Sequence, residues 1–329
     1  VTTTYYARTR NTTTGCISAC ATVTVTVNAL PSTPTGITAA PAAICSGSSS
    51  TISVNNPGTG YTTDWFTGSC GGTALPGGTG QNSVLVNPAA TTTYYARTRN
   101  TTTGCISACA TVTVTVNALP STPTGITAAP AAICSGSSST ISVNNPGTGY
   151  TTDWFTVSCG GTPLEGGTGQ NSVSVSPAAT TTYYARTRNT STGCVSSCST
   201  VTVTVNPLPS SPAGITASPD VICSGSSSTI SVTDPGTGFT TDWFTGSCGG
   251  TALEGGTGQN SVSVSPTATT TYYARTRNTT TGCVSACETV TVTVSTSGIW
   301  TGSADGSTWE MGGNWCGGSV PTGAVVIPA

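Results

Sequence analysis

Charge is scarce in this 329-residue chain, which carries 8 basic and 10 acidic residues. Only 5% of its residues are charged, against about 25% in a typical soluble domain. All the basic residues are arginine and histidine is absent, which excludes histidine acid–base catalysis and histidine metal ligands. A net charge of −2 with no basic cluster argues strongly against nucleic-acid binding.

Carboxylates and long apolar runs are also lacking. Asp64 is the only carboxylate between residues 31 and 119, so that segment can build neither an acid–base pair nor a calcium cage. No run of about 18 apolar residues occurs, so no membrane span is expected in this window. The chain is therefore predicted to be non-enzymatic and to bind no cofactor or metal, although a catalytic domain could lie beyond residue 329 in a longer protein.

A tandem repeat of 89 residues organises the chain. The string Tyr-Tyr-Ala-Arg recurs four times at this interval, first at Tyr5, and residues 1–89 differ from residues 90–178 at six positions. An interval of 89 exceeds the usual 20–50 residues of a solenoid repeat and matches a small domain. Each unit is therefore expected to fold on its own.

Proline-rich runs mark the boundaries between units, the first at residues 30–34. Proline fixes φ and disfavours helix just before it, so these junctions are expected to be short and semi-rigid. The predicted domains are 1–30 (the C-terminal part of a truncated unit), 31–119, 120–208, 209–297, and 298–329 (the start of a different β-rich module).

Strand signals occur throughout the unit 31–119, where Val112, Val114 and Val116 alternate with threonines. Glycine and proline turns separate seven predicted strands, near 36–44, 50–55, 61–67, 73–76, 81–87, 92–100 and 108–117. This pattern predicts an all-β tandem array of seven-stranded Ig-like β-sandwich domains, with Trp65 buried on the third strand. A small closed β-barrel is the structural alternative.

Charge sets the direction of the side chains on the predicted strand 92–100. Arg97 and Arg99 share one face, and burying both without partners would be very costly. They are therefore predicted to face water together with Tyr95. The residues on the opposite face, predicted to point into the core, are Tyr94, Ala96 and Thr98.

Burial of Trp65 turns its neighbours Asp64 and Phe66 outward. The third and sixth strands are adjacent in an Ig-like sandwich, so Asp64 is predicted to meet an arginine and Phe66 to meet Tyr95. The structural interpretation is a surface ladder contributing a few tenths of a kcal/mol per pair. The functional interpretation is a patch that grips sugar or a neighbouring filament, formed by Phe66, Tyr95, Arg97, Arg99, Phe155, Tyr184, Arg186, Arg188, Phe244, Tyr273, Arg275 and Arg277.

Cysteines recur four to a unit, which points to an oxidising compartment and disulfides. The strand order places Cys45 and Cys70 at one end of the sandwich and Cys105 and Cys109 at the other, which predicts the pairs Cys45–Cys70 and Cys105–Cys109. The first pair would stabilise the unit by roughly 2–4 kcal/mol. The corresponding pairs are Cys134–Cys159, Cys194–Cys198, Cys223–Cys248 and Cys283–Cys287. A four-cysteine zinc site is the alternative, disfavoured by the spacing and the compartment.

Other short motifs have structural interpretations. The Gly-Thr-Gly strings lack a following helix and a lysine, so they are turns rather than phosphate loops. The alternating threonines, as at residues 22–26, suggest ice binding, but one run per sandwich cannot form a flat multi-strand face. Asn100 begins a three-residue N-glycosylation sequon, whose use depends on the host.

Four strings together resemble a known family: residues 44–47 (ICSG), 65–73 (WFTGSCGGT), 91–97 (TTTYYAR) and 111–116 (TVTVTV). They are similar to Ig-like repeats in very large secreted surface proteins of the Bacteroidota. The segment from Gly298 to Pro328 looks like the opening of another module common in those proteins. The resemblance implies export, by the type IX secretion system, to the outside of a bacterial cell, where members include gliding-motility adhesins and other adhesins.

The function predicted from these features is a structural stalk or filament segment of a bacterial cell-surface protein. Such a stalk would space or display an adhesive part, and its low charge would permit lateral association with neighbouring copies. The alternative is an adhesin module that binds glycans or solid surfaces through the repeated aromatic and arginine patch. No nucleic-acid partner is expected.

Overall fold

The computed structural model describes residues 1–302, 304, 306–323 and 325. The described chain is nearly all β-structure, as predicted. It begins with one antiparallel hairpin, β1 (Thr3–Ala7) and β2 (Ala21–Val25). Three repeats of eight strands each follow.

The strands of the three repeats occupy equivalent positions. The first repeat contains β3 (Thr38–Ala40), β4 (Ala43–Cys45), β5 (Ser50–Ser53), β6 (Tyr61–Thr67), β7 (Thr73–Thr79), β8 (Ser83–Val86), β9 (Thr92–Asn100) and β10 (Ile106–Asn117). The second contains β11 (Thr127–Ala129), β12 (Ala132–Cys134), β13 (Ser139–Ser142), β14 (Tyr150–Thr156), β15 (Thr162–Thr168), β16 (Ser172–Val175), β17 (Thr181–Asn189) and β18 (Val195–Asn206). The third contains β19 (Thr216–Ser218), β20 (Val221–Cys223), β21 (Ser228–Ser231), β22 (Phe239–Thr245), β23 (Thr251–Thr257), β24 (Ser261–Val264), β25 (Thr270–Asn278) and β26 (Val284–Ser295).

Each repeat is a sandwich of two sheets. In the first repeat a three-stranded sheet has the order β3-β5-β8 and a five-stranded sheet the order β4-β10-β9-β6-β7. The pair β4–β10 is parallel and the other pairs are antiparallel. The two sheets remain separate, so the β-barrel alternative is wrong and the sandwich prediction is confirmed.

The first predicted strand, 36–44, is two strands rather than one. The chain pairs with β5 through residues 38–40, then passes to the other sheet and pairs with β10 through residues 43–45. Pro41 lies between these segments and has no N–H to offer a ladder, so pairing on one sheet stops there. Each sandwich consequently has eight strands where seven were predicted.

The core lies between the two sheets and is centred on a tryptophan. Trp65 is 0% exposed and donates its Nε1 hydrogen to the carbonyl of Gln81 at 2.9 Å. The predicted inward residues of β9 are buried, with Tyr94 at 3%, Ala96 at 0% and Thr98 at 3% exposure. The equivalent residues of the other two repeats form matching cores.

The hairpin at residues 1–30 has no second sheet to cover it. Its register, with Tyr5 opposite Val23, is the register of Tyr94 opposite Val112 in the first repeat. Tyr5 is nevertheless 57% exposed, whereas Tyr94 is 3% exposed. The burial of this tyrosine therefore depends on the opposite sheet and not on the hairpin.

The segment after residue 297 differs from the repeats, and the predicted β-rich module is visible there only as one bridge. Its described residues contain the short 3₁₀ helix η1 (Gly312–Asn314) and an isolated bridge between Trp300 and Trp315. Trp309 packs edge-on against Trp315 at 4.4 Å between ring centroids. Residues 303, 305, 324 and 326–329 of the predicted module lie outside the described residues.

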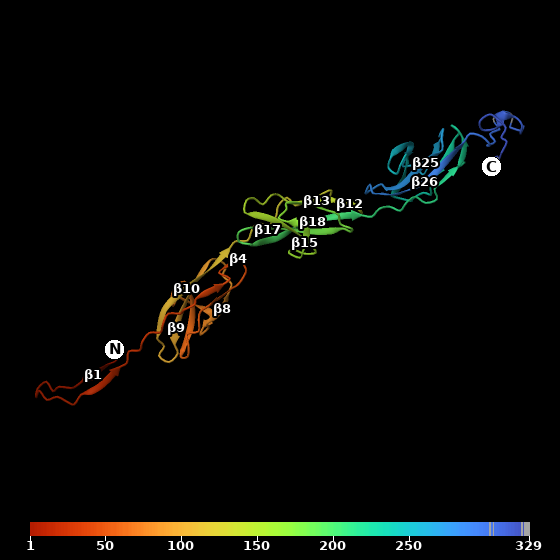
Figure 1. Cartoon of the computed structure of the whole chain (residues 1–329). Coiled ribbons are helices and arrows are strands. Elements are labelled where there is room, and N and C mark those ends of the chain that lie inside the picture. The colour runs from red at the N-terminus through yellow and green to blue at the C-terminus, as the bar shows by residue number, and fades with distance from the viewer. Residues whose placement is uncertain (303, 305, 324, 326–329) are drawn as a thin grey trace.

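The three sandwiches follow one another along a line, so the molecule is an extended rod (Figure 1). The strands β10 and β18 each run toward the next repeat, which places successive repeats end to end. This arrangement brings the end of one repeat against the start of the next, where the cysteines are found.

Candidate functional site: the junctions between repeats

A cysteine lies beside the point where the chain leaves each repeat. In the first repeat Cys45 ends β4 and is paired in register with Asn117, the last residue of β10. The Ser46 N–H donates to the Asn117 carbonyl at 2.9 Å, which holds the two strand ends together. Because the linker to the next repeat starts at residue 118, Cys45 and the linker leave the sandwich side by side.

This cysteine is bonded to the next repeat. Cys45 forms a disulfide with Cys194, 149 residues away, with 5.6 Å between the Cα atoms. Cys194 directly precedes β18 in the second repeat. The same bond joins Cys134 to Cys283 at the following junction, again with a separation of 149 residues. Each of these junctions is thus crossed by two covalent connections, the linker and a disulfide.

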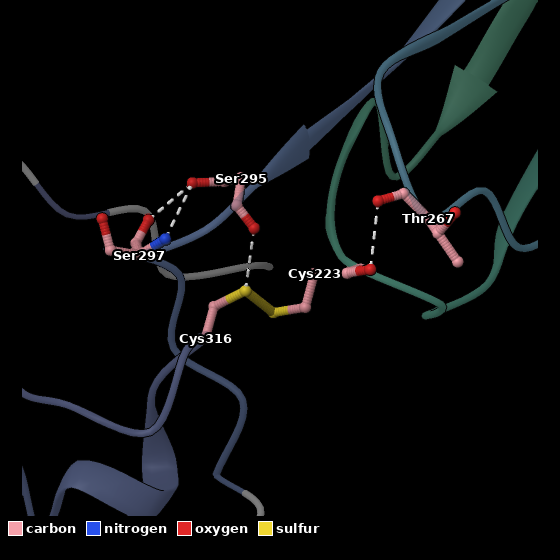
Figure 2. Close-up of a disulfide and its surroundings, with 6 residues drawn as sticks. Cys223, Thr267, Ser295, Ser297 and Cys316 are labelled. Carbon is pink, nitrogen blue, oxygen red and sulfur yellow. Dashed lines mark hydrogen bonds between the residues drawn. A yellow bond between two sulfur atoms is a disulfide. The ribbon is translucent and has the colours of Figure 1, made fainter.

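A third bond of this type ends the series (Figure 2). Cys223 is joined to Cys316, which lies in the different segment after the third repeat. Cys316 is 4% exposed, and its sulfur lies 3.1 Å from the carbonyl oxygen of Ser295, the last residue of β26. The segment after residue 297 therefore takes over the role that Cys194 and Cys283 have in the repeats.

The predicted pair Cys45–Cys70 is wrong. The two cysteines do not share an end of the sandwich: Cys45 lies beside Asn117, the last residue of β10, whereas Cys70 lies beside Cys109, near the start of that strand. The eight residues from Cys109 to Asn117 span about 26 Å of extended strand, so Cys45 and Cys70 lie beyond the roughly 7 Å that a disulfide can span between Cα atoms. The same argument corrects Cys134–Cys159 and Cys223–Cys248.

The predicted pair Cys105–Cys109 is also wrong. Cys109 lies within β10 and Cys105 just before it, and four residues of extended strand span about 13 Å. Cys109 instead bonds to Cys70, with 5.8 Å between Cα atoms. The corresponding bonds, which replace the predicted Cys194–Cys198 and Cys283–Cys287, are Cys159–Cys198 and Cys248–Cys287.

The thiol of Cys105 is free, as are those of Cys16 and Cys20. Cys105 occupies in the first repeat the position that Cys194 and Cys283 occupy in the later ones. Cys194 and Cys283 are 1% exposed, whereas Cys105 is only half-buried. The preceding repeat therefore covers this position as well as bonding to it.

The Cys70–Cys109 disulfide shapes the predicted patch. It draws the loop after β6 back over the outer face of the sheet as far as β10. A side chain at Gly71 in this loop would meet the Arg97 guanidinium at 3.1 Å. The outer face of the sheet is consequently partly covered rather than open.

Asp64 is buried beneath this covered face, although it points outward as predicted. Its side chain is 6% exposed and accepts two hydrogen bonds from Arg99, from Nε at 2.7 Å and Nη2 at 3.1 Å. The Nε of Arg97 lies 4.0 Å from the same carboxylate. The predicted pairing of Asp64 with an arginine is confirmed, but it is a bidentate, largely desolvated ion pair rather than an exposed ladder.

Phe66 is buried as well, at 7% exposure. It lies opposite Tyr95 in register, as predicted, and the Arg97 guanidinium stacks over its ring at 4.5 Å from the centroid. Phe155 and Phe244 lie under Arg186 and Arg275 in the same way. The expectation that Phe66 lies exposed is wrong, because its own arginine and the disulfide-bonded loop cover it.

The contacts between arginine and aspartate shift the pKa values of three arginines and of Asp242. The hydrogen bond and charge of Asp64 raise the pKa of Arg99, and the equivalent aspartates raise those of Arg188 and Arg277. For Asp242, burial alone would raise the pKa. The hydrogen bonds and charge of Arg277, the Gly258 N–H and the charge of Arg275 together outweigh burial and lower it. The partners of Asp242 therefore hold it as a carboxylate.

A family model described as "Ig-like domain CHU_C associated" matches residues 31–118, 120–207 and 209–295. The chain belongs to this family of Ig-like domains. The predicted resemblance and the Ig-like fold class are therefore confirmed.

Two solved structures are similar to the chain at low sequence identity. The FN1–FN3 domains of chicken CNTN1 are 15% identical over 80% of this chain and 100% of that chain, with a TM-score of 0.27. The D1–D4 fragment of ICAM-5 is 14% identical over 89% of this chain and 83% of that chain, with a TM-score of 0.39. No curated protein matches the chain.

The six disulfides and the family membership indicate an extracellular protein. Ig-like repeats are typically structural modules rather than enzymes. Within the described ranges, no three or more His, Cys, Asp or Glu side chains gather where they could hold a metal ion. In that same part of the chain, no helix has the length and hydropathy to span a membrane.

The inter-repeat bonds of these Ig-like domains are the feature that sequence reasoning missed. A signal for them was present, since pairing within each unit leaves Cys316 without a partner in a segment of a different kind. Pairing Cys223 forward to Cys316 implies that Cys45 and Cys134 also pair forward. Identical spacing in every unit hides this shift, because bonds within a unit and bonds to the next unit repeat with the same period.

Proposed function

We propose that this chain is a segment of a stiff, non-enzymatic stalk in a bacterial cell-surface protein. The observation that carries the proposal is the double covalent connection after each of the three repeats, formed by the linker and by Cys45–Cys194 or its equivalent. One flexible connection lets two domains swivel, whereas a second connection beside it ties the end of one repeat to the start of the next and restricts how far they can bend apart. The stalk would hold an adhesive part away from the cell.

The surface of the repeats fits this role. Most of their charge is engaged in the cluster around Asp64 and its equivalents, so neighbouring stalks would repel one another weakly. Lateral association with other copies is therefore part of the proposal. Export by the type IX system and display at the cell surface are also part of it, and antibody labelling of intact cells of the source bacterium tests the location.

The alternative, glycan binding by the aromatic and arginine patch, is weakened by the burial of Phe66 under Arg97. Tyr95 is the half-buried aromatic residue that remains accessible on this face. Glycan-array binding that is lost in a Tyr95→Ala, Tyr184→Ala and Tyr273→Ala variant would favour the alternative over a purely structural stalk.

Small-angle X-ray scattering tests the stiffness of the stalk. The oxidised chain is expected to behave as a rod in which each repeat adds about 40 Å, the length of a nine-residue strand with its loops and linker. A variant with Cys45, Cys134 and Cys223 and their partners Cys194, Cys283 and Cys316 changed to serine should show a broader distribution of lengths. Equal flexibility in the two proteins would contradict the proposal.

A further inference from the structure

The two sets of disulfides meet within each repeat. In the second repeat, Cys194 is bonded to the first repeat, and Cys198 follows it four residues later in the sequence. Cys198 is bonded to Cys159. The segment between Cys134 and Cys159 contains β13 and β14. Cys134 is bonded to the third repeat, through Cys283. The same order of bonds and spacings occurs in the third repeat, from Cys283 to Cys316.

We propose that the disulfides form one continuous covalent path that carries tensile load along the stalk and limits how far it can stretch. We count one backbone step for each move from a residue to its neighbour in the sequence. From Cys194 to Cys283 the disulfide path has 29 such steps, 4 to Cys198 and 25 between Cys159 and Cys134, whereas the polypeptide between the same two cysteines has 89. A pulled network becomes taut along its shortest connection. The disulfide path therefore takes the load, and the longer polypeptide stays slack.

The path divides each repeat into a loaded part and a shielded part. In the second repeat the loaded part is residues 134–159, which contain β13 and β14, and the short segment 194–198. The shielded part contains β15, β16, β17 and most of β18. Force can extract the loaded strands but cannot straighten the shielded ones while the bonds are intact.

The number of steps sets the greatest length of the whole chain. The shortest bonded route from Val1 to Ala329 has 115 backbone steps and crosses five disulfides: 44 steps to Cys45, 29 through each of two repeats, and 13 after Cys316. Without disulfides the chain has 328 steps. At about 3.4 Å per step the limits are about 400 Å with the bonds and about 1,100 Å without them.

The two sets of disulfides make separable contributions. If the inter-repeat bonds are absent and the bonds within repeats remain, the shortest route has 211 steps, made of 69, 50, 50 and 42 between successive bonds. Its limit is about 700 Å. The greatest lengths of the fully bonded chain, the chain without inter-repeat bonds and the fully reduced chain therefore differ by far more than the length of one strand.

Single-molecule force spectroscopy on the full chain, held through tags at its two ends, tests the inference. The oxidised protein should reach a contour length of about 400 Å, and the same protein in reductant about 1,100 Å. The matched control is the variant with serine at Cys45, Cys134, Cys223, Cys194, Cys283 and Cys316, which should reach about 700 Å under oxidising conditions.

The inference rests on the proposed stalk function, but its failure is distinguishable from failure of that function. If the oxidised unmodified protein reaches the contour length expected of the serine variant, the inter-repeat bonds carry no load and the inference is overturned. The rod would still stand if scattering found it stiff. A chain that is flexible in scattering but stops at the short, fully bonded contour length would instead reject the stiff stalk and retain the load path.

Discussion

At the residue scale, the scarce charge of the protein is concentrated in one repeated cluster. All eight arginines lie at two positions of the repeat, and three of the ten acids lie at the position of Asp64. Asp64 is buried, and removing it would leave two arginines without their shared carboxylate. Low charge therefore does not mean that charge is unimportant in this protein.

Asp242 makes the stability of the third repeat depend on pH. The pKa of Asp242 is lowered in the folded state, against about 3.9 for an unfolded aspartate. Its contribution is thus fully present above about pH 4 and is lost as pH falls through the folded value. We expect urea denaturation to show the third repeat losing stability below pH 4, and Asp242→Asn to reduce this dependence.

The control for this experiment is Glu254→Gln, which changes an exposed carboxylate of the same repeat. It should leave the acid dependence unchanged. A third repeat whose stability is the same at pH 7 and pH 2.5 would contradict the role assigned to Asp242.

Val157 is held in an unfavourable backbone conformation. Its φ is +71°, where the equivalent Gly68 and Gly246 have +81° and +82°. A β-branched residue is strained in this region, by about 1–2 kcal/mol, and Val157 is 81% exposed and gains little packing. Val157→Gly should therefore stabilise the second repeat by about 1 kcal/mol, which calorimetry would detect as a Tm increase of about 4–8 °C.

The reverse changes test the same explanation. Gly68→Val and Gly246→Val should each destabilise their own repeat by a similar amount. If Val157→Gly lowers the Tm, the strain is not the dominant effect at this position.

At the element scale, the loop between β6 and β7 is a cover for the sheet rather than a simple turn. It is fixed by Cys70–Cys109, which closes a loop of 39 residues. It covers the face on which Arg97 stacks over Phe66. This loop, together with Arg97, shields Phe66 from solvent.

Removing that disulfide should destabilise the first repeat. The double change Cys70→Ser and Cys109→Ser is expected to cost about 2–4 kcal/mol, because the unfolded repeat regains the freedom of the closed loop. Chemical denaturation under oxidising conditions measures the change. Cys105→Ser, which removes a free thiol of the same repeat, is the control and should alter stability by less than about 0.5 kcal/mol.

At the scale of the whole molecule, the inter-repeat bonds convert a string of Ig-like domains into one cross-linked rod. Successive sandwiches lie end to end (Figure 1). The cysteine beside the start of each linker, Cys45 or Cys134, forms a disulfide with the next domain. The last such bond joins a repeat to a segment of a different fold (Figure 2). The same junction chemistry therefore serves partners of unlike structure.

Disulfide mapping of the unreduced protein tests this connectivity. Digestion should yield the Cys45 and Cys134 peptides linked to those of Cys194 and Cys283, whose Gly-Cys-Val sequence differs from the Gly-Cys-Ile of Cys105. Thiol titration should find three free thiols, on Cys16, Cys20 and Cys105. Linkage of Cys45 to Cys70, with Cys316 free, would restore pairing within repeats.

The sequence by itself determined the repeat, the sandwich and the direction of side chains on its strands. These follow from local rules: the period of 89, the alternation along β9 and β10, and the cost of burying unpaired arginine. The interval of two residues between Arg97 and Arg99 was enough to assign Tyr94 and Ala96 to the core. No knowledge of neighbouring repeats was needed for these conclusions.

Only the tertiary structure decided which cysteines meet and what covers the outer face. A disulfide requires Cα atoms within about 7 Å, and that distance depends on strand order and on how one repeat abuts the next. Cys45 lies beside the last residue of β10 and Cys70 beside Cys109 near its start, about 26 Å apart along the strand, whereas Cys194 reaches Cys45 from another domain. The sequence spacing is the same whether the cysteines pair within a repeat or with the next repeat, so only the distances in the folded protein distinguish the two pairings.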